Sequence, residues 1–498
     1  MVSEINGSSI NDRRAVERQL RSNDPDMNTQ QTNTQPKENP LGTRPLGKLL
    51  LSLAVPAIIA NVVNALYNIV DQIFIGQDSG KLGNAATSVS FPLTTICMAI
   101  GLMTGLGAAS GFNLELGRKN EAKAKKIAGS AVGMLVICGV TICVLVRIFL
   151  KPMLVAFGAT DNILPYAEQY AGITSFGIPF VLFSTGTNPL VRADRSPRYS
   201  MAAIVIGAVL NTILDPIFIF AFRWGIRGAA WATVISQILS AGILVAYFPR
   251  FKSVRFAVKD FIPRFTEVFD ICRLGLNSFI FQSSNLLVQI TLNNVLRTYG
   301  EQSAYGADTP IAVAGIVTKI NVIFIALIIG LINGAQPICS YNYGAKKYGR
   351  VRHTVKLFMT AAVIISTTLW LVFEIFPKPI ISLFGDGGDD PLYVEYGVRF
   401  MRAFLFCVFL NGMQICCATF FPAIGKAAKG ALLSFSKQIV FLIPLLLILP
   451  RFFGLEGIKY AQPVTDLLTF LLAMAFLWHE MRKMPKEDMP QQRAASDE

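Results

Sequence analysis

The sequence predicts an all-α integral membrane protein in which twelve transmembrane helices form two pseudo-symmetric six-helix lobes. Three observations carry this prediction. The 498 residues are 53% hydrophobic and only 15% charged, their apolar segments are long enough to cross a bilayer, and motifs of the first half recur in the second. A composition this apolar excludes a soluble protein.

Windows of roughly twenty apolar residues give the expected spans. They lie near residues 49–76, 85–112, 127–149, 171–191, 200–222, 229–248, 272–297, 311–338, 355–376, 398–421, 431–450 and 458–479.

The internal repeat appears when the halves are shifted by about 229 residues, the kind of period sought first in any chain. Matching pairs are Gly101 and Gly330, Gly105 and Gly334, Asn113 and Asn342, and Gly225 and Gly454. The shared offset predicts lobes at 47–248 and 272–480, joined by a basic cytoplasmic linker at 249–271. Polar residues 1–46 and 481–498 are expected to be cytoplasmic tails, the first disordered.

Lysine and arginine concentrate in the loops after even-numbered spans and in the linker, about 20 against about 7 on the other side. The chain is therefore expected to cross the plasma (inner) membrane many times, with both termini cytoplasmic. This rule explains the net charge of +14, so no nucleic-acid partner is expected. The linker interleaves basic residues with Phe251, Phe256, Phe261 and Phe265, which suits either a segment on the anionic inner leaflet or a simple connection.

The sequence shows no motif that would support enzymatic chemistry or ATP hydrolysis. The chain has no GxxxxGK[ST] loop, and its eight cysteines show no CxxC pairing. We expect no cofactor, no structural metal and no enzyme activity.

Carboxylates inside apolar segments occur in the first lobe, at Asp71 and Asp215. Asn61, Asn64 and Asn68 precede Asp71 at helical spacing, so all four share one face of the first span. Asn211 precedes Asp215 by one turn of the fifth span. Counting residues from the outer ends places both acids roughly 8–12 Å deep, and Thr233 enters at a similar level.

Asp71, Asn211, Asp215 and Thr233 therefore could converge and offer only oxygen ligands. Such a set suits either Na⁺ or a proton shared by two acids, and both options couple transport to an ion. In the alternative interpretation, each aspartate only caps or hydrogen-bonds neighbouring backbone, and Asp215 could satisfy a carbonyl freed by Pro216. Pro56, two turns into the first span, predicts a hinge.

The second lobe carries amides and bases in its spans instead of paired acids. Polar candidates for lining a substrate cavity are Asn64, Asn68, Gln282, Asn285 and Lys319. Lys437 and Arg402 are expected to extend toward an interface. No function is predicted for Asp466.

The segments Ala54-Val-Pro56, Leu66-Tyr-Asn-Ile-Val-Asp71, Asn211-Thr-Ile-Leu-Asp215-Pro and Gly225-Ile-Arg-Gly-Ala-Ala-Trp-Ala-Thr233 resemble the multidrug and toxic compound extrusion (MATE) family. The likeness runs from about residue 44 to 479 and is greatest to the DinF-like branch and its MepA-like multidrug exporters. It implies two six-helix lobes facing each other in a V. It also implies a cation site at the positions of Asp71, Asn211, Asp215 and Thr233, and bending at Pro56.

The resemblance further implies a secondary active exporter that exchanges organic cations and drugs for H⁺ or Na⁺ by alternating access, with a monomer in the bilayer as the default. The acidic residues that the NorM-like branch carries in spans seven and ten are missing here. A lipid-linked oligosaccharide flippase of the same superfamily is the alternative, although such a protein would need several cavity arginines. A binding or receptor protein without transport is a third.

Overall fold

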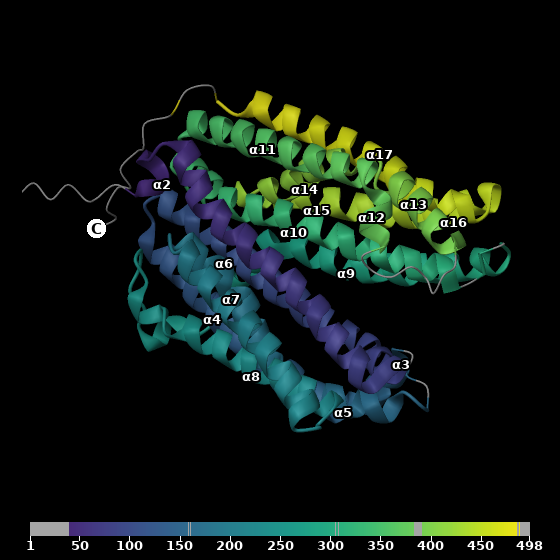
Figure 1. The fold of residues 1–498 in the computed structure, drawn as a ribbon. Coiled ribbons are helices and arrows are strands. Elements are labelled where there is room, and N and C mark those ends of the chain that lie inside the picture. Colours follow the sequence, from purple (N-terminus) through teal and green to yellow (C-terminus); the bar gives the residue numbers. More distant parts are fainter. Residues whose placement is uncertain are drawn as a thin grey trace, which may run out of the picture. The chain divides into compact units, whose positions relative to one another are not determined.

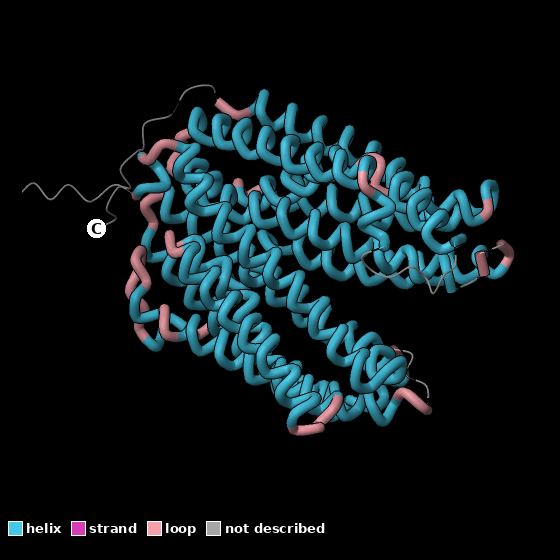
Figure 2. Tube along the Cα trace, in the orientation of Figure 1, coloured by secondary structure: helices cyan, strands magenta, loops and turns pink. Residues whose placement is uncertain are grey.

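The structure is a computed structural model that describes residues 39–157, 159, 161–303, 305–306, 308–382, 391–485 and 488. Every regular element in these residues is a helix (Figure 2), which confirms the all-α fold. Most of the two expected tails lies outside the described residues, although Pro40–Thr43 forms the short helix α2. Residues 44–498 form one compact unit.

The helices follow one another along the chain as the colours of Figure 1 show. The N-terminal half contains α3 (Leu46–Gly117), α4 (Glu121–Ala156), α5 (Leu164–Thr174), η2 (Ser175–Gly177), α6 (Ile178–Ala193), α7 (Pro197–Pro216), η3 (Ile217–Ala221), α8 (Ile226–Val245), η4 (Phe248–Arg250) and η5 (Val258–Phe261). The C-terminal half contains α9 (Phe265–Glu301), α10 (Asp308–Gly344), α11 (Tyr348–Ile375), α12 (Pro377–Ser382), α13 (Pro391–Phe404), α14 (Val408–Ala423), α15 (Ala427–Phe435), η6 (Ser436–Leu442), α16 (Ile443–Phe453) and α17 (Leu455–Lys483).

Helix α3 contains two spans that run in opposite directions, Leu46–Ile75 and Ala86–Gly117. Along α10, Gly330 meets Ile58 and Gly334 meets Ala54, so α10 is antiparallel to the first span. Along the second span of α3, the contacts with α10 advance in the same chain direction, so these two segments are parallel. Gln336 donates to Ser110 at 2.7 Å, and Gly344 meets Leu114. The chain therefore turns back between residues 75 and 86.

Nine helices of the described chain are long and apolar enough to span a membrane, or ten when the bent pair Tyr393–Phe404 and Val408–Ala423 is counted as one span. The other two expected spans have recognisable reasons for failing this test. Helix α9 is 37 residues long, but its many amides lower its hydropathy. The fourth window is divided among α5, η2 and α6. Twelve membrane crossings are consistent with these elements.

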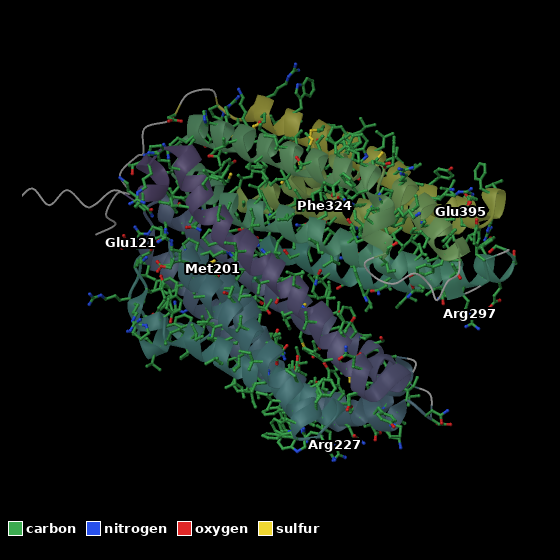
Figure 3. The ribbon with its side chains drawn as sticks, in the orientation of Figure 1. Glu121, Met201, Arg227, Arg297, Phe324 and Glu395 are labelled. Carbon is green, nitrogen blue, oxygen red and sulfur yellow. The ribbon has the colours of Figure 1, made fainter. Side chains whose placement is uncertain are left out.

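The turns that carry most basic residues, at 118–126, 192–198, 250–264 and 346–356, follow α3, α6, α8 and α10. We call the end of the unit where they lie the basic end. Contacts hold these turns together: Lys123 Nζ lies 3.6 Å from Asp270, and the Lys252 amide donates to Asp194. Glu121 marks this end in Figure 3, whereas Arg227 and Arg297 lie toward the opposite end.

Close glycine contacts join α3 of the N-terminal half to α9 and α10 of the C-terminal half. We call Gly107, Gly117, Gly275, Gly330, Gly334 and Gly344 the glycine interface. A Cβ added at Gly275 would lie 1.8 Å from the Met103 carbonyl oxygen, and one at Gly334 would lie 2.4 Å from Ala54. Because no side chain fits there, the two backbones approach closely. The interface extends from the basic end along the first span only as far as Ile58.

The linker between the halves is folded against the N-terminal half. Phe251 packs edge-on against Phe112, with ring centroids 6.0 Å apart, and Phe256 and Phe261 join the same aromatic cluster. Lys125 binds Asp260 at 2.8 Å, and this hydrogen bond lowers the pKa of the Asp260 carboxyl. Phe251, Phe256 and Phe261 thus contact protein, whereas Phe265 is 87% exposed, and both interpretations of the linker stay predictions.

The two halves share an irregularity in their fifth spans. A π-helical turn, η3, follows α7 directly, and a second, η6, follows α15. A π turn widens the helix and changes which side chains face its neighbours, and such turns are frequent at functional sites. In each half the π turn lies beside buried charged residues.

Candidate functional site

The candidate site is formed where the first span of α3 meets α7 and α8. The side chains of Asp71 and Asp215 lie within hydrogen-bonding reach of each other. Asp215 is fully buried, and Asp71 is partly buried. Each ionised carboxylate is only an acceptor, so a direct hydrogen bond between the two requires a proton on one of them. The structure thus brings together the two acids singled out from the sequence.

Asn211 and Thr233 complete the predicted set. The Asn211 amide donates to Asp215 Oδ1 at 3.2 Å across one turn of α7. The side chain of Thr233, on α8, lies near the Tyr170 side chain of α5. Tyr67 and Tyr170 are close enough to both acids to interact electrostatically with them. Four elements therefore supply polar groups to one small volume.

Three buried oxygens of this cluster have no hydrogen-bond partner among the described residues. They are Asp71 Oδ1, Asn211 Oδ1 and Asp215 Oδ2. Buried acceptors are almost always satisfied, and each unsatisfied one is expensive in a membrane. Their presence argues against the view that the aspartates only satisfy nearby backbone. Three acceptors with no donor form a suitable site for a proton or a bare cation.

An apolar cluster closes the site on the side away from the basic end. Ile75 lies one turn beyond Asp71, Ile219 one turn beyond Asp215, and Ala229 one turn before Thr233; all three are buried and packed with Phe74 and Tyr170. We call this cluster the plug. Beyond it lies a pocket of about 480 Å³. Its lining residues are Asp78, Tyr166, Gln169, Ile219, Phe220, Arg223, Trp224, Gly225 and Ile226. Ile219 belongs both to the plug and to the lining of this pocket, so it separates the pocket from the acids.

The asparagines of the first span have mainly local partners. Asn61 donates to the Ala57 carbonyl at 2.8 Å, and Asn68 donates to the Asn64 carbonyl. The backbone remains helical through Pro56, so the hinge stays a prediction. Pro56 lies between Ala54 and Ile58, the residues that meet Gly334 and Gly330.

Of the substrate-cavity candidates, Lys319 lines a pocket and the others do not line either described pocket. The Lys319 pocket has a volume of about 470 Å³ and lies between α3 and α10. Asn285 accepts a hydrogen bond from Gln438 inside the C-terminal half. Asn64 and Gln282 are partly buried and Asn68 is exposed.

The C-terminal half contains a buried ion pair between its fifth and sixth spans. Lys437 Nζ lies 3.1 Å from Asp466 Oδ1, with side chains only 7% and 2% exposed. Asn411 accepts from Lys437, and Gln462 donates to Asp466. The expectation that Lys437 reaches an interface is wrong, because Asp466 satisfies its charge inside the bundle. Arg402, 51% exposed, donates to the Glu374 carbonyl, as a residue near an interface can.

Two tyrosines of the acid site were not expected from the sequence. Tyr67 lies one helical turn before Asp71, so the spacing that selected Asn64 and Asn68 could have found it. Tyr170 comes from α5, and nothing in its local sequence indicates this position. The eight cysteines are all unpaired, and the described residues contain no group of three or more histidine, cysteine and acidic side chains able to hold a metal.

Comparisons with known proteins agree with this architecture. The family model described as MatE matches residues 56–217 and 302–448, more than half of the chain. Proteins named "Multidrug export protein MepA" from Staphylococcus haemolyticus and Staphylococcus aureus are 25% and 26% identical to it, and each alignment covers 87% of this chain and 94% of the relative. A solved structure of a MOP superfamily transporter from Pyrococcus furiosus superposes with a TM-score of 0.82, at 23% identity, over 89% of this chain and 97% of that one.

Proposed function

The chain belongs to the MatE family, a family of membrane transporters and not of enzymes, and on this premise we propose that it is a secondary active multidrug exporter. It exchanges organic cations and other drugs for H⁺ or Na⁺ by alternating access. The names of its relatives support drug export. The lobes at 47–248 and 272–480 are the bodies that move, and the basic end faces the cytoplasm.

The acid cluster is the observation that carries the ion coupling. Its three unpartnered oxygens, Asp71 Oδ1, Asn211 Oδ1 and Asp215 Oδ2, leave negative charge without a donor inside a membrane. An arriving H⁺ or Na⁺ supplies the missing partner and neutralises the site. Because the ion binds only where these groups converge, any movement of the first span relative to α7 changes its affinity.

The transport cycle follows from the two contact regions of the first span. Near its start the glycine interface holds it against α10, which closes the basic end. Near its end Asp71 faces α7. Ion binding at Asp71 and Asp215 draws the first span toward α7, Pro56 allows the bend between the two regions, and the drug is released at the opposite end. A single chain contains all these parts, in keeping with a monomer.

Ethidium efflux from proteoliposomes tests this function. The wild type is expected to export ethidium when one gradient, H⁺ or Na⁺, is imposed alone, and Asp215→Asn is expected to abolish the response. Asp161→Asn, at an exposed acid, is the matched control. If the protein is folded and its efflux depends on neither gradient, the proposal is overturned and the flippase is favoured.

A further inference from the structure

Two basic residues lie near the end of α4 that is remote from the basic end. Arg147 and Lys151 are one helical turn apart, so they share a face of α4. Arg147 follows Lys126 of the basic end by 21 positions of the chain, which is roughly 31 Å along a helix and close to the thickness of the hydrocarbon core of a bilayer. The two cations therefore lie near the opposite membrane interface, the side on which lysine and arginine are scarce.

The face of α4 that carries these cations is turned toward lipid. Val144, Ile148 and Val155 are 50%, 65% and 52% exposed, and with Lys151 they follow one another at spacings of three or four residues. Arg147 and Lys151 are exposed as well. An exposed apolar stripe on a membrane helix contacts acyl chains, so the two cations lie where acyl chains meet headgroups.

Contacts with the next helices fix the Arg147 side chain. Its Nη1 donates to the Gly172 carbonyl at 3.2 Å and lies 3.4 Å from the Ser175 hydroxyl oxygen, where α5 ends. The guanidinium group lies over the Phe176 ring, 4.1 Å from its centroid, and Phe176 stacks on Trp231 of α8. Among the described residues Nε and Nη2 have no recorded partner. The group is therefore held in place with donors left for a ligand.

The chemistry of these groups selects a phosphate that carries a net negative charge. Arginine binds phosphate oxygens through paired N–H groups, and Lys151 adds a second positive charge one turn away. Neither residue has an ion-pair partner among the described residues. A role limited to satisfying the Gly172 carbonyl would explain Arg147 but not Lys151. A zwitterionic headgroup would bring its own cation next to these two, whereas an anionic headgroup would not.

We propose that Arg147 and Lys151 form a binding site for an anionic phospholipid in the leaflet opposite the basic end. The phosphodiester lies between the two cations, and the acyl chains extend along the stripe that contains Val144. Phe176 and Trp231, which are 46% and 39% exposed, contact the glycerol region, where aromatic side chains are favoured. This inference goes beyond the export function and does not depend on which drug is carried.

Quenching of tryptophan fluorescence by brominated lipids tests this site. Trp231 is the reporter, and the other three tryptophans of the chain are replaced by phenylalanine. The full chain is reconstituted in phosphatidylcholine vesicles with increasing fractions of brominated phosphatidylglycerol, or of brominated phosphatidylcholine as the reference. We expect the brominated phosphatidylglycerol to quench at lower fractions. Lys151→Gln is expected to lower its affinity relative to phosphatidylcholine about fivefold, the effect of one basic residue near an anionic lipid surface.

Lys151→Gln is the decisive variant, because no contact of this side chain with protein is recorded in the described part of the chain. Arg147→Gln should give a similar loss, and Lys151→Arg should keep the wild-type preference. Lys378→Gln, at an exposed lysine just after α11, is the matched control and should also keep it. An unchanged preference in Lys151→Gln, or an equal loss in Lys378→Gln, would overturn the site. Loss of the preference on adding inorganic phosphate at constant ionic strength would assign the cations to a soluble anion and would also overturn it.

Discussion

At the scale of single residues, the decisive feature is a pair of acids that each have one buried oxygen without a donor among the described residues. Burying a carboxylate in a bilayer is so unfavourable that such residues are normally paired or neutralised. Lys437 and Asp466 solve this problem inside the protein, because each supplies the other's counterion. Asp71 and Asp215 have no such partner among the described residues, which is why we propose that their counterion is the exchanged ion.

Because Asp71 and Asp215 form one site, their effects on transport should not add. Asp71→Asn and Asp215→Asn are each expected to lower gradient-driven efflux at least about tenfold, and the double variant is expected to lose no more than either single variant. Initial rates of ethidium efflux measure this. Independent, multiplicative losses would show that the two carboxyls bind separate ions.

Ile219 is expected to control access to the acids from the pocket beyond the plug. Ala229→Cys in a cysteine-free background gives a reporter, because Ala229 is fully buried in the plug. Its labelling by a small charged thiol reagent should be slow, and Ile219→Ala should accelerate it about tenfold or more by opening a cavity at the contact. Ile206→Ala, at an exposed isoleucine of α7 in the same span, is the matched control. An equal labelling rate in both variants would place the entry route elsewhere.

At the scale of helices, the π turns η3 and η6 lie beside buried charge in both halves, but the two sites have different chemistry. The N-terminal site has unsatisfied acceptors, which suit the ion that we propose it binds. The C-terminal site is internally neutral, and its contacts join η6 to α17 and to α14. Each half therefore has buried charge beside a π turn of its fifth span, but the charged groups are of different kinds.

In the C-terminal half, Lys437 and Asp466 are expected to depend on each other for their effect on the stability of the protein. Lys437→Met leaves Asp466 buried without a counterion, which is expected to destabilise the protein by about 3–5 kcal/mol. Combining it with Asp466→Leu should restore most of that stability, since two apolar side chains of similar size can pack in the same place. Equilibrium denaturation in mixed micelles measures both. A double variant as unstable as the single one would assign the pair a role beyond mutual neutralisation.

Sequence patterns predicted the acid cluster well because helical spacing and depth can be counted along a chain. The 3.6-residue period and the length of a span were enough to predict that Asp71, Asn211 and Asp215 lie close together. To predict that Lys437 is buried, one would have to know that Asp466, 29 residues later, is its partner. No local sequence pattern indicates this contact. The same applies to the linker, whose aromatic residues could pack on membrane or on protein. The substrate-cavity candidates Asn64, Asn68, Gln282 and Asn285 remain predictions.

At the scale of the whole unit, the contact between the halves includes a set of close backbone approaches at glycines. The glycine interface leaves no space for even one methyl group at Gly275 or Gly334. Side-chain interdigitation, which would resist separation, is absent at these glycine positions. An interface of this kind can close tightly and still open without repacking a core, as alternating access requires.

Gly334→Ala is expected to prevent closure at the basic end. Its new Cβ would meet backbone atoms of Ala54, which cannot move aside. Spin labels at Lys119 and Lys347 should report a longer distance than in wild type, and efflux should fall. Gly315→Ala, on the same helix with nothing within 4 Å of the added Cβ, should leave both unchanged. A closed basic end in Gly334→Ala would remove the glycine interface from the transport cycle.

Ion exchange at the acid pair can be observed most directly without a membrane. Purified protein is loaded with protons or Na⁺ in weakly buffered detergent solution, ethidium is added, and released ions are detected with a pH dye or a Na⁺ electrode. We expect wild type to release one kind of ion on binding the drug and Asp215→Asn to bind ethidium without release. Ion release that persists undiminished in both Asp71→Asn and Asp215→Asn would contradict the central claim that these two carboxyls hold the coupling ion.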